Sequence, residues 1–234
     1  MTISHTSLAT GLLIIGLLSS PIADVIARAQ NAAIRPAAPS LVRPTTPTKG
    51  PDADGFLQRW LILEPFPVTG QLTESAVQTA IRTQGFPDQL AAISQDGETL
   101  TVGATQLAWH AVDTVGYNVN LYHFAYALNK PTSNVLFWAV TIVNAPRDLS
   151  DVRLAIGSNA ASIWWVNGTE VIGIYNERQT VIDDGVSKRL TLKKGPNVIR
   201  GAIINAGGHT DFCARFLDGE NRPLKGITVS LADR

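Results

Sequence analysis

Ser158, His209 and Asp211 are the residues of this chain that could act together in ester hydrolysis. In such a triad the serine attacks a carbonyl carbon, the histidine accepts the serine proton, and the aspartate orients the histidine. The local sequence does not support this chemistry. Ser158 lies in I-G-S-N-A, which lacks both the Gly-x-Ser-x-Gly elbow of α/β hydrolases and a Gly-Asp-Ser nucleophile. A triad would form only if folding brought the three residues together, and we expect no catalytic residues.

The other histidines and carboxylates lack the spacing of a metal or glycosidase site. No histidine pairs with another at i+2, i+3 or i+4. His110 and His123 lie in strand-like runs, where we expect structural roles. Asp183 and Asp184 are adjacent, so on a strand they would point to opposite faces and could not flank a sugar as a catalytic pair. We expect turn residues there and no cofactor. A structural calcium ion is left open, although no repeated Asp-x-Asp loop supports one.

Aromatic and polar residues in the C-terminal half indicate a binding surface instead. Trp164 and Trp165 are adjacent on a predicted strand, so their side chains leave opposite faces and cannot enter the same core. A surface indole presents a flat apolar face to a sugar ring, and neighbouring polar side chains can bond its hydroxyls. In the alternative interpretation both tryptophans are core residues and Arg178 pairs with Asp183 or Asp184. We expect a binding site that contains Trp164, Tyr175, Asn176, Arg178, His209 and Asp211.

These residues lie on a predicted run of antiparallel strands joined by tight turns. Asn167-Gly168 separates two apolar, β-rich runs, which is the strongest short signal for a hairpin. Further turns are expected at 194–197 and 205–208. Because strand and turn recur about every ten residues, the pattern favours an antiparallel sandwich.

Upstream residues predict one helix and several strands. Residues 73–83 place Val77 and Ile81 on one side, which is helical spacing, with Thr73 as the N-cap and Gly85 as the stop. Residues 117–128 contain aromatic residues at even spacing from Tyr122 onward, which predicts a strand that presents these on one face. The remaining predicted strands are 56–66, 99–102, 107–112, 136–143, 152–156 and 163–166, of which 136–143 is apolar enough to be central and buried on both faces.

The order of these signals is similar to galactose-binding-like β jelly rolls, including the sugar-binding domains of family 2 glycoside hydrolases. The resemblance covers about the last third of the chain and implies a fold more strongly than a function. The wider pattern, from G-F-L-Q-R-W at 55–60 onward, resembles secreted bacterial proteins that carry the name acetylxylan esterase. The residues that carry the first resemblance are Trp165, Val166, Asn167, Gly168, Arg178, Asp183, Leu192, Lys194, Gly195, Asn197 and Asn205. We therefore expect an all-β, antiparallel jelly-roll sandwich with one short helix.

Composition excludes several classes of protein. Lys and Arg total 19 and Asp and Glu total 19, so the chain gives no electrostatic reason to bind nucleic acid. Hydrophobic residues make up 45% of the chain, which is enough for a substantial core. Cys213 is the single cysteine, so no intramolecular disulfide can form, and its strand-like context predicts burial as a small hydrophobe.

The N-terminal region has the composition of an export signal followed by a spacer. Residues 8–18 are apolar but too few to span a bilayer, and Ala27-Arg28-Ala29 forms a small-x-small cleavage site before Gln30. Because 1–7 contain no Lys or Arg, an uncleaved anchor is the alternative. Residues 30–53 are rich in proline, which favours an extended linker. We predict a signal peptide at 1–29, a linker at 30–53 and a β domain at 54–234, in a protein that is secreted, periplasmic or in the cell envelope.

Three classes of function are consistent with these features. The first is a non-catalytic module that binds a polysaccharide or other glycan or supports another protein. The second is a carbohydrate esterase of the acetylxylan esterase type, as the wider resemblance implies. The third is an envelope protein that binds a partner protein from its proline-rich stalk. The missing catalytic motif favours the first class over the second. A protein that binds no glycan on an array would favour the third class.

Overall fold

Two antiparallel β-sheets packed face to face build this computed structural model, which describes residues 40–68, 72–83, 93–176 and 178–231. All of these belong to the unit Ile34–Arg234. The large sheet has the strand order β1-β5-β2-β7-β13-β9-β10, with β3 and β15 also paired to β7 and β4 paired to β5. The small sheet has the order β11-β8-β14-β6, with β12 paired to β8. The prediction of an antiparallel β-sandwich is confirmed.

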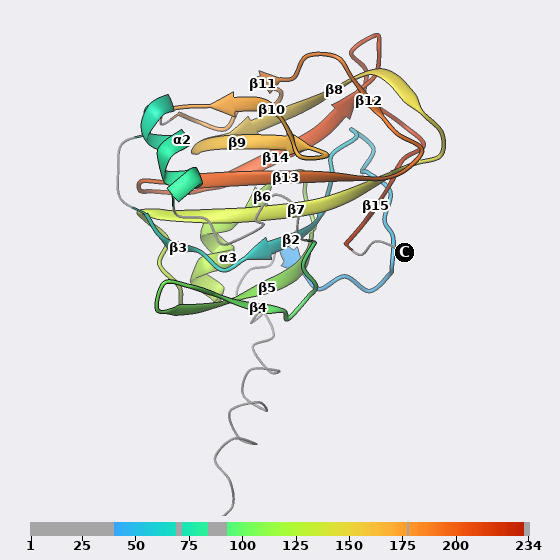
Figure 1. Ribbon diagram of the computed structural model, residues 1–234. Coiled ribbons are helices and arrows are strands. Elements are labelled where there is room, and N and C mark those ends of the chain that lie inside the picture. The colour runs from blue at the N-terminus through green and yellow to red at the C-terminus, as the bar shows by residue number, and fades with distance from the viewer. Residues whose placement is uncertain (1–39, 69–71, 84–92, 177, 232–234) are drawn as a thin grey trace, which may run out of the picture. The chain divides into compact units, whose positions relative to one another are not determined.

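Each sheet combines segments that are distant in sequence (Figure 1). The large sheet consists of β1 (Leu41–Val42), β2 (Arg59–Leu63), β3 (Phe66–Pro67), β4 (Thr99–Val102), β5 (Thr105–Thr114), β7 (Val135–Ala145), β9 (Ala161–Val166), β10 (Thr169–Ile174), β13 (Gly195–Asn205) and β15 (Thr228–Ser230). The small sheet consists of β6 (Val119–Asn120), β8 (Leu149–Ser158), β11 (Gly185–Val186), β12 (Leu190–Leu192) and β14 (Asp211–Leu217). The helices are α2 (Glu74–Thr83) and α3 (Leu121–Ala127).

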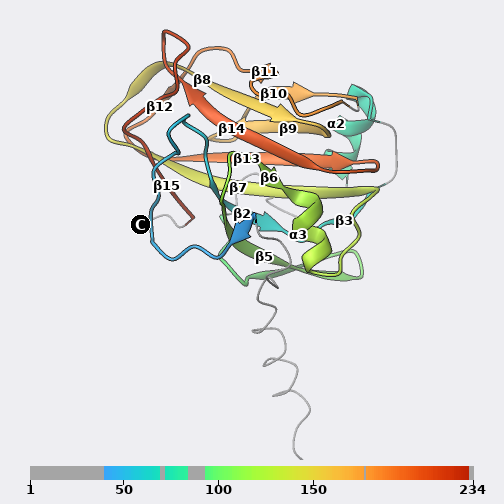
Figure 2. The same ribbon diagram turned by 180° about the vertical axis from the view of Figure 1, so that it is seen from behind.

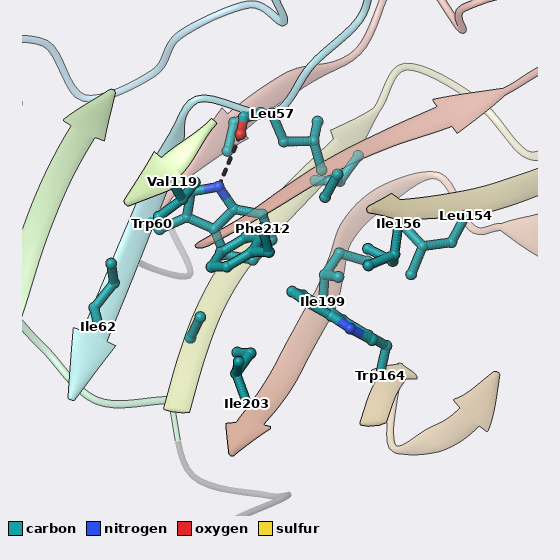
Figure 3. Close-up of a cluster of buried hydrophobic side chains, with 14 of the residues drawn as sticks. Leu57, Trp60, Ile62, Val119, Leu154, Ile156, Trp164, Ile199, Ile203 and Phe212 are labelled. Atoms are coloured by element: carbon teal, nitrogen blue, oxygen red, sulfur yellow. Dashed lines mark hydrogen bonds between the residues drawn. The ribbon is translucent and has the colours of Figure 1, made fainter. Parts of the chain in front are cut away.

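The main core lies between the two sheets and contains alternate residues of the facing strands. Trp60 of β2, Trp164 of β9 and Phe212 of β14 form its aromatic centre, with ring centroids 5.0–5.9 Å apart. Figure 3 shows these rings among aliphatic side chains from both sheets, with the Trp60 indole N–H donating to the Leu57 carbonyl at 2.8 Å. Cys213 is buried, as expected.

A second core covers the opposite face of the large sheet, which explains why β7 is mostly apolar and buried along nearly its whole length. Val77 and Ile81 of α2 pack there with Trp138 and Trp165. Helix α2 begins at Glu74 and thus confirms the predicted helix, whereas Gly85, its expected end, lies outside the described residues. Figure 1 shows α2 in front of the large sheet, on the side away from β8 and β14.

The prediction of a strand over 117–128 is wrong, because Leu121–Ala127 form helix α3. The Asn120 side chain accepts a hydrogen bond from the His123 main-chain N–H at 2.7 Å and thereby caps the helix. Leu121, Phe124 and Ala125 are buried at helical spacing. The even spacing of the aromatic residues indicated a strand, although the same residues satisfy a helical period.

The predicted hairpin at Asn167-Gly168 is confirmed. Thr169 pairs with Val166, so Asn167 and Gly168 form a two-residue loop with φ values of 50° and 79°. Positive φ at both central residues is typical of a type I′ turn, which Asn-Gly favours. An alanine-type Cβ at Gly168 would meet no atom within 4 Å, so conformation and not space requires glycine there.

Gly168→Val should therefore lower the free energy of unfolding by about 1–3 kcal/mol, because a β-branched residue is strained at positive φ. Thermal denaturation measures this effect. Thr169→Ala is the matched control, since it removes the Asn-Gly-Thr glycosylation sequon and leaves the turn intact. An unchanged melting temperature for Gly168→Val, or equal damage from Thr169→Ala, would contradict this account of the hairpin.

Part of the predicted proline-rich linker packs on the sandwich, which corrects the domain start expected at residue 54. Leu41 is buried and its strand β1 pairs with β5. Lys49 forms a β-bridge with Val229, so the segment crosses from one strand of the large sheet to another. The predicted signal peptide and the first part of the linker lie outside the described residues. Within the described ranges, no helix is both long and apolar enough to cross a membrane.

Candidate functional site

Asp211 lies at the centre of a polar cluster where strand β14 begins. Its carboxylate accepts hydrogen bonds from the Asn118 amide at 2.7 Å and from the Thr180 hydroxyl. Its main-chain N–H donates to Asn159 Oδ1 at 3.0 Å, and the Asn159 amide donates to the His209 carbonyl at 2.6 Å. Two segments, through Asn118 and Thr180, thus fix the direction of a carboxylate that is only half-buried, and a third, through Asn159, holds its main chain. An ionised carboxylate has about four acceptor sites, so Asp211 can still bond a ligand hydroxyl.

An exposed aromatic group adjoins this cluster. The ring centroids of His209 and Tyr122 are 4.9 Å apart, and Tyr126 lies nearly parallel to Tyr122 with centroids 6.3 Å apart. The Tyr122 main-chain N–H donates to the Thr210 carbonyl at 3.0 Å, so helix α3 is joined directly to the loop before β14. Figure 2 shows α3 and β14 on the same side of the large sheet. Tyr126 is 64% exposed, which leaves its ring available to a ligand.

Two buried oxygens in this region have no hydrogen-bond partner among the described residues, Asn118 Oδ1 and Thr210 Oγ1. Buried polar atoms are usually paired, and an ordered water can serve where no protein group does. Both residues border Asp211, one through its side chain and one along the chain. Because both oxygens are buried, the Asp211 carboxylate is the acceptor in this cluster that a ligand hydroxyl can reach.

Arg178 lies beside this cluster but forms an ion pair, as the alternative interpretation expected. Its main-chain N–H donates to the Asn159 carbonyl at 3.2 Å. Its guanidinium contacts the Asp184 carboxylate and donates to the Tyr175 carbonyl at 2.7 Å. The structure thus brings together three of the six predicted binding residues, Arg178, His209 and Asp211.

The other three predicted residues do not join them. Trp164 is 0% exposed in the core between the sheets, so its inclusion in a binding surface is corrected: the alternation that separates it from Trp165 directs it inward. Tyr175 packs with the second core, and its hydroxyl accepts a hydrogen bond from Gln78 of α2 at 3.2 Å. The main-chain N–H of Asn176 donates to the Leu72 carbonyl at 2.8 Å. Tyr175 and Asn176 are thus held on the α2 side of the large sheet.

The Ser158–His209–Asp211 set does not form a triad. Ser158 is fully buried, and its hydroxyl contacts the main-chain carbonyls of Ala160 at 3.0 Å and Asp211 at 3.5 Å. The His209 ring contacts Tyr122, and the Asp211 carboxylate contacts Asn118 and Thr180. No group of three or more His, Cys, Asp or Glu side chains able to hold a metal ion occurs in the described part of the chain. The structural calcium ion that the sequence left open is thus not supported by any such group among the described residues.

An ion pair between the buried Glu64 and the partly buried Lys130 fixes the other end of α3. The Glu64 carboxylate lies 2.8 Å from Lys130 Nζ, just after α3, and 3.2 Å from His110 Nε2 of β5. Burial disfavours the charged carboxylate, yet hydrogen bonds from His110 and Lys130 lower the pKa of Glu64 below its ordinary value. His110 thus has the structural role that its sequence context predicted. The group helps to position the helix that carries Tyr122 and Tyr126.

Sequence reasoning missed Asn118, Tyr122, Tyr126, Asn159 and Thr180. A signal for two of them was present, because the helical period of Leu121, Phe124 and Ala125 places Tyr122 and Tyr126 together on the opposite side. Nothing local in the sequence connects Asn118, Asn159 and Thr180, since their contacts to the segment 209–211 depend on the pairing of β14 with β6 and β8.

Comparisons with known proteins show only distant likeness. No family model matches the chain, and no curated protein matches it. Among solved structures, the PA14 domain of the antifreeze protein MpAFP is 11% identical, with 70% of this chain and 85% of that chain covered and a TM-score of 0.43. The A domain of epithelial adhesin 9 from Candida glabrata, in complex with Galb1-3GlcNAc, is 11% identical, with 83% and 95% covered and a TM-score of 0.40.

A beta-glucosidase from Kluyveromyces marxianus is 16% identical with a TM-score of 0.39. The match covers 68% of this chain but only 16% of the beta-glucosidase. Because identities and TM-scores are this low, none of these comparisons decides what the chain binds.

Proposed function

We propose that this β-sandwich is a non-catalytic module that binds a glycan at the Asp211 site. One observation carries the proposal: a half-buried carboxylate with fixed direction lies beside an exposed aromatic group. Aromatic rings present an apolar face to the C–H groups of a sugar, and an ionised carboxylate forms strong hydrogen bonds to hydroxyls.

The position of Ser158 supports a binding role over an esterase role. Its hydroxyl is directed to main-chain carbonyls in the interior, away from any surface where an acetylated polysaccharide could reach it. We further propose that the module acts outside the cytoplasm, on the tether that the N-terminal composition predicts. If no glycan binds, a partner protein is the alternative ligand.

A glycan array that includes xylan oligosaccharides, probed with wild-type protein and Asp211→Asn, tests the proposal. The substitution keeps the shape of the side chain, and Asn118 can rotate its amide to donate or accept as required. Loss of a charge-assisted hydrogen bond worth about 1.5–3 kcal/mol should weaken binding about tenfold to a hundredfold. Wild-type binding to at least one glycan and its loss in Asp211→Asn are the expected results.

Asp218→Asn is the matched control, because Asp218 follows the opposite end of β14 and pairs with Arg222 in a turn. It should bind glycans like the wild type. Undiminished glycan binding by Asp211→Asn would show that the glycan binds at another site. If the wild-type protein binds no glycan, the proposed function is refuted. Acetyl release from xylan that disappears in Ser158→Ala would establish the esterase instead.

A further inference from the structure

Residues 178–184 form a segment, here named the strap, that lies across the outer face of the small sheet. An ideal Cβ at Gly157 would be 2.3 Å from the Val181 carbonyl oxygen and 2.8 Å from Cys213 Sγ. Gly157 and Cys213 are paired in β8 and β14, and their neighbours Ile156, Phe212 and Ala214 point into the core. Val181 therefore covers both residues from outside, and only glycine leaves room for it.

Polar contacts hold the strap in place. The Asp183 carboxylate pairs with Arg215, whose Nε lies 2.9 Å from Asp183 Oδ1. The Thr180 hydroxyl donates to the Asp211 carboxylate. Arg215 is itself placed by the Phe56 ring, 4.9 Å from its guanidinium carbon, and by the Asp54 carbonyl at 3.0 Å.

The apolar side chains of the strap do not anchor it. Val181 is 56% exposed and Ile182 is 45% exposed. A segment with few buried apolar contacts opens at a lower free energy than the whole domain. Loss of the Asp183–Arg215 pair would leave the strap attached mainly through Thr180 and Arg178.

We propose that the strap opens and closes as a unit over β8 and β14, with the Asp183–Arg215 pair holding it closed, and that closure orients Asp211 for its ligand. In the closed state Thr180 fixes one carboxylate oxygen of Asp211. Opening removes this hydrogen bond and leaves Asn118 alone to hold the carboxylate, so its direction is less well defined and a ligand binds less well. The effect on ligand binding rests on the proposed function, whereas the opening itself does not.

Cys213 reports on the strap without any ligand. It is the single cysteine, it is 1% exposed, and burial raises the pKa of its thiol to about 11. Its thiolate attacks the disulfide of Ellman's reagent, forms a mixed disulfide and releases one thionitrobenzoate, which is coloured. Because the reaction requires an exposed thiolate, its rate follows the population of the open strap.

Asp183→Asn should raise the labelling rate of the full chain about tenfold, because it replaces an ion pair by a neutral contact. Asp218→Asn is the matched control at an ion pair outside the strap and should label like the wild type. The rate should also depend weakly on urea well below the unfolding transition, as expected for a local opening. Unchanged labelling in Asp183→Asn, or a urea dependence equal to that of global unfolding, would overturn the proposal.

Gly157→Ala tests the same opening from the opposite side, since its methyl group would displace the Val181 carbonyl. Faster labelling supports the strap; slow labelling in a folded Gly157→Ala protein contradicts it. If this variant does not fold, the labelling rate of Asp183→Asn still tests whether the strap opens. A glycan found on the array should slow labelling, because a ligand stabilises the state that it binds. If Asp183→Asn is labelled fast but the wild-type protein binds no glycan, the opening of the strap is supported and only the proposed function is refuted.

Discussion

Replacing Trp164 with alanine should lower the free energy of unfolding by about 3–5 kcal/mol, the usual cost of removing a buried tryptophan. Its indole is 0% exposed and contacts the rings of Trp60 and Phe212. Its N–H donates to the Ser162 hydroxyl at 3.0 Å, which would lose its partner. An ideal Cβ at Gly201 would lie 2.5 Å from the indole, so the surrounding strands are shaped to this ring. Chemical denaturation measures the change.

Two further variants distinguish packing from binding. Trp164→Phe should be less harmful than the alanine variant, since it keeps an aromatic ring in the core. Tyr126→Ala should leave stability within about 0.5 kcal/mol, because the Tyr126 side chain is mostly exposed. If Trp164→Ala retained its melting temperature and lost glycan binding, Trp164 would belong to the ligand site and its assignment to the core would be wrong.

Replacing Arg59 with methionine should also lower the free energy of unfolding by about 3–5 kcal/mol, because a buried carboxylate loses its partner. Arg59 is 1% exposed and donates to both oxygens of Asp113, at 2.8 and 2.9 Å. The same guanidinium donates to the Thr46 carbonyl at 2.6 Å. Lys49 lies 3.9 Å from Asp113 and compensates only partly. Limited proteolysis should therefore cut the segment 43–49 faster in this variant, alongside its lower melting temperature.

Arg43→Met is the control for this prediction. Arg43 pairs with Asp96 at 2.6 Å, but its side chain is 75% exposed, and such surface pairs contribute little. Its stability should stay within about 0.5 kcal/mol of the wild type. Equal stability of the two variants would show that the segment 43–49 is not held by the buried ion pair.

Local patterns predicted those parts of the fold that depend on local chemistry. Asn167-Gly168 specifies its hairpin through positive φ, and Val77 and Ile81 specify α2 through helical spacing. The linker was mispredicted because its attachment depends on Arg59 and Asp113, which are 54 positions apart. Helix α3 was mispredicted because evenly spaced aromatic residues fit two periods, and the Asn120 cap decides between them.

The site was harder to predict than the fold. His209 and Asp211 were found because they are unusual residues in a turn-rich loop. Their partners Asn118 and Thr180 come from segments 93 and 31 positions away from Asp211. Such contacts arise from strand pairing across the small sheet, and no pattern in the sequence around Asn118 or Thr180 indicates them.

Hydrogen exchange with and without a bound glycan tests the central claim most directly, because it locates the ligand on the sandwich. The Asp211 site predicts slower exchange in three described segments, 118–126, 178–184 and 209–211, and no change in the α2 side that carries Tyr175. The Asp211→Asn variant should show no such protection at the same glycan concentration. Protection confined to α2 and the β9–β10 hairpin, with 178–184 and 209–211 unaffected, would contradict the account.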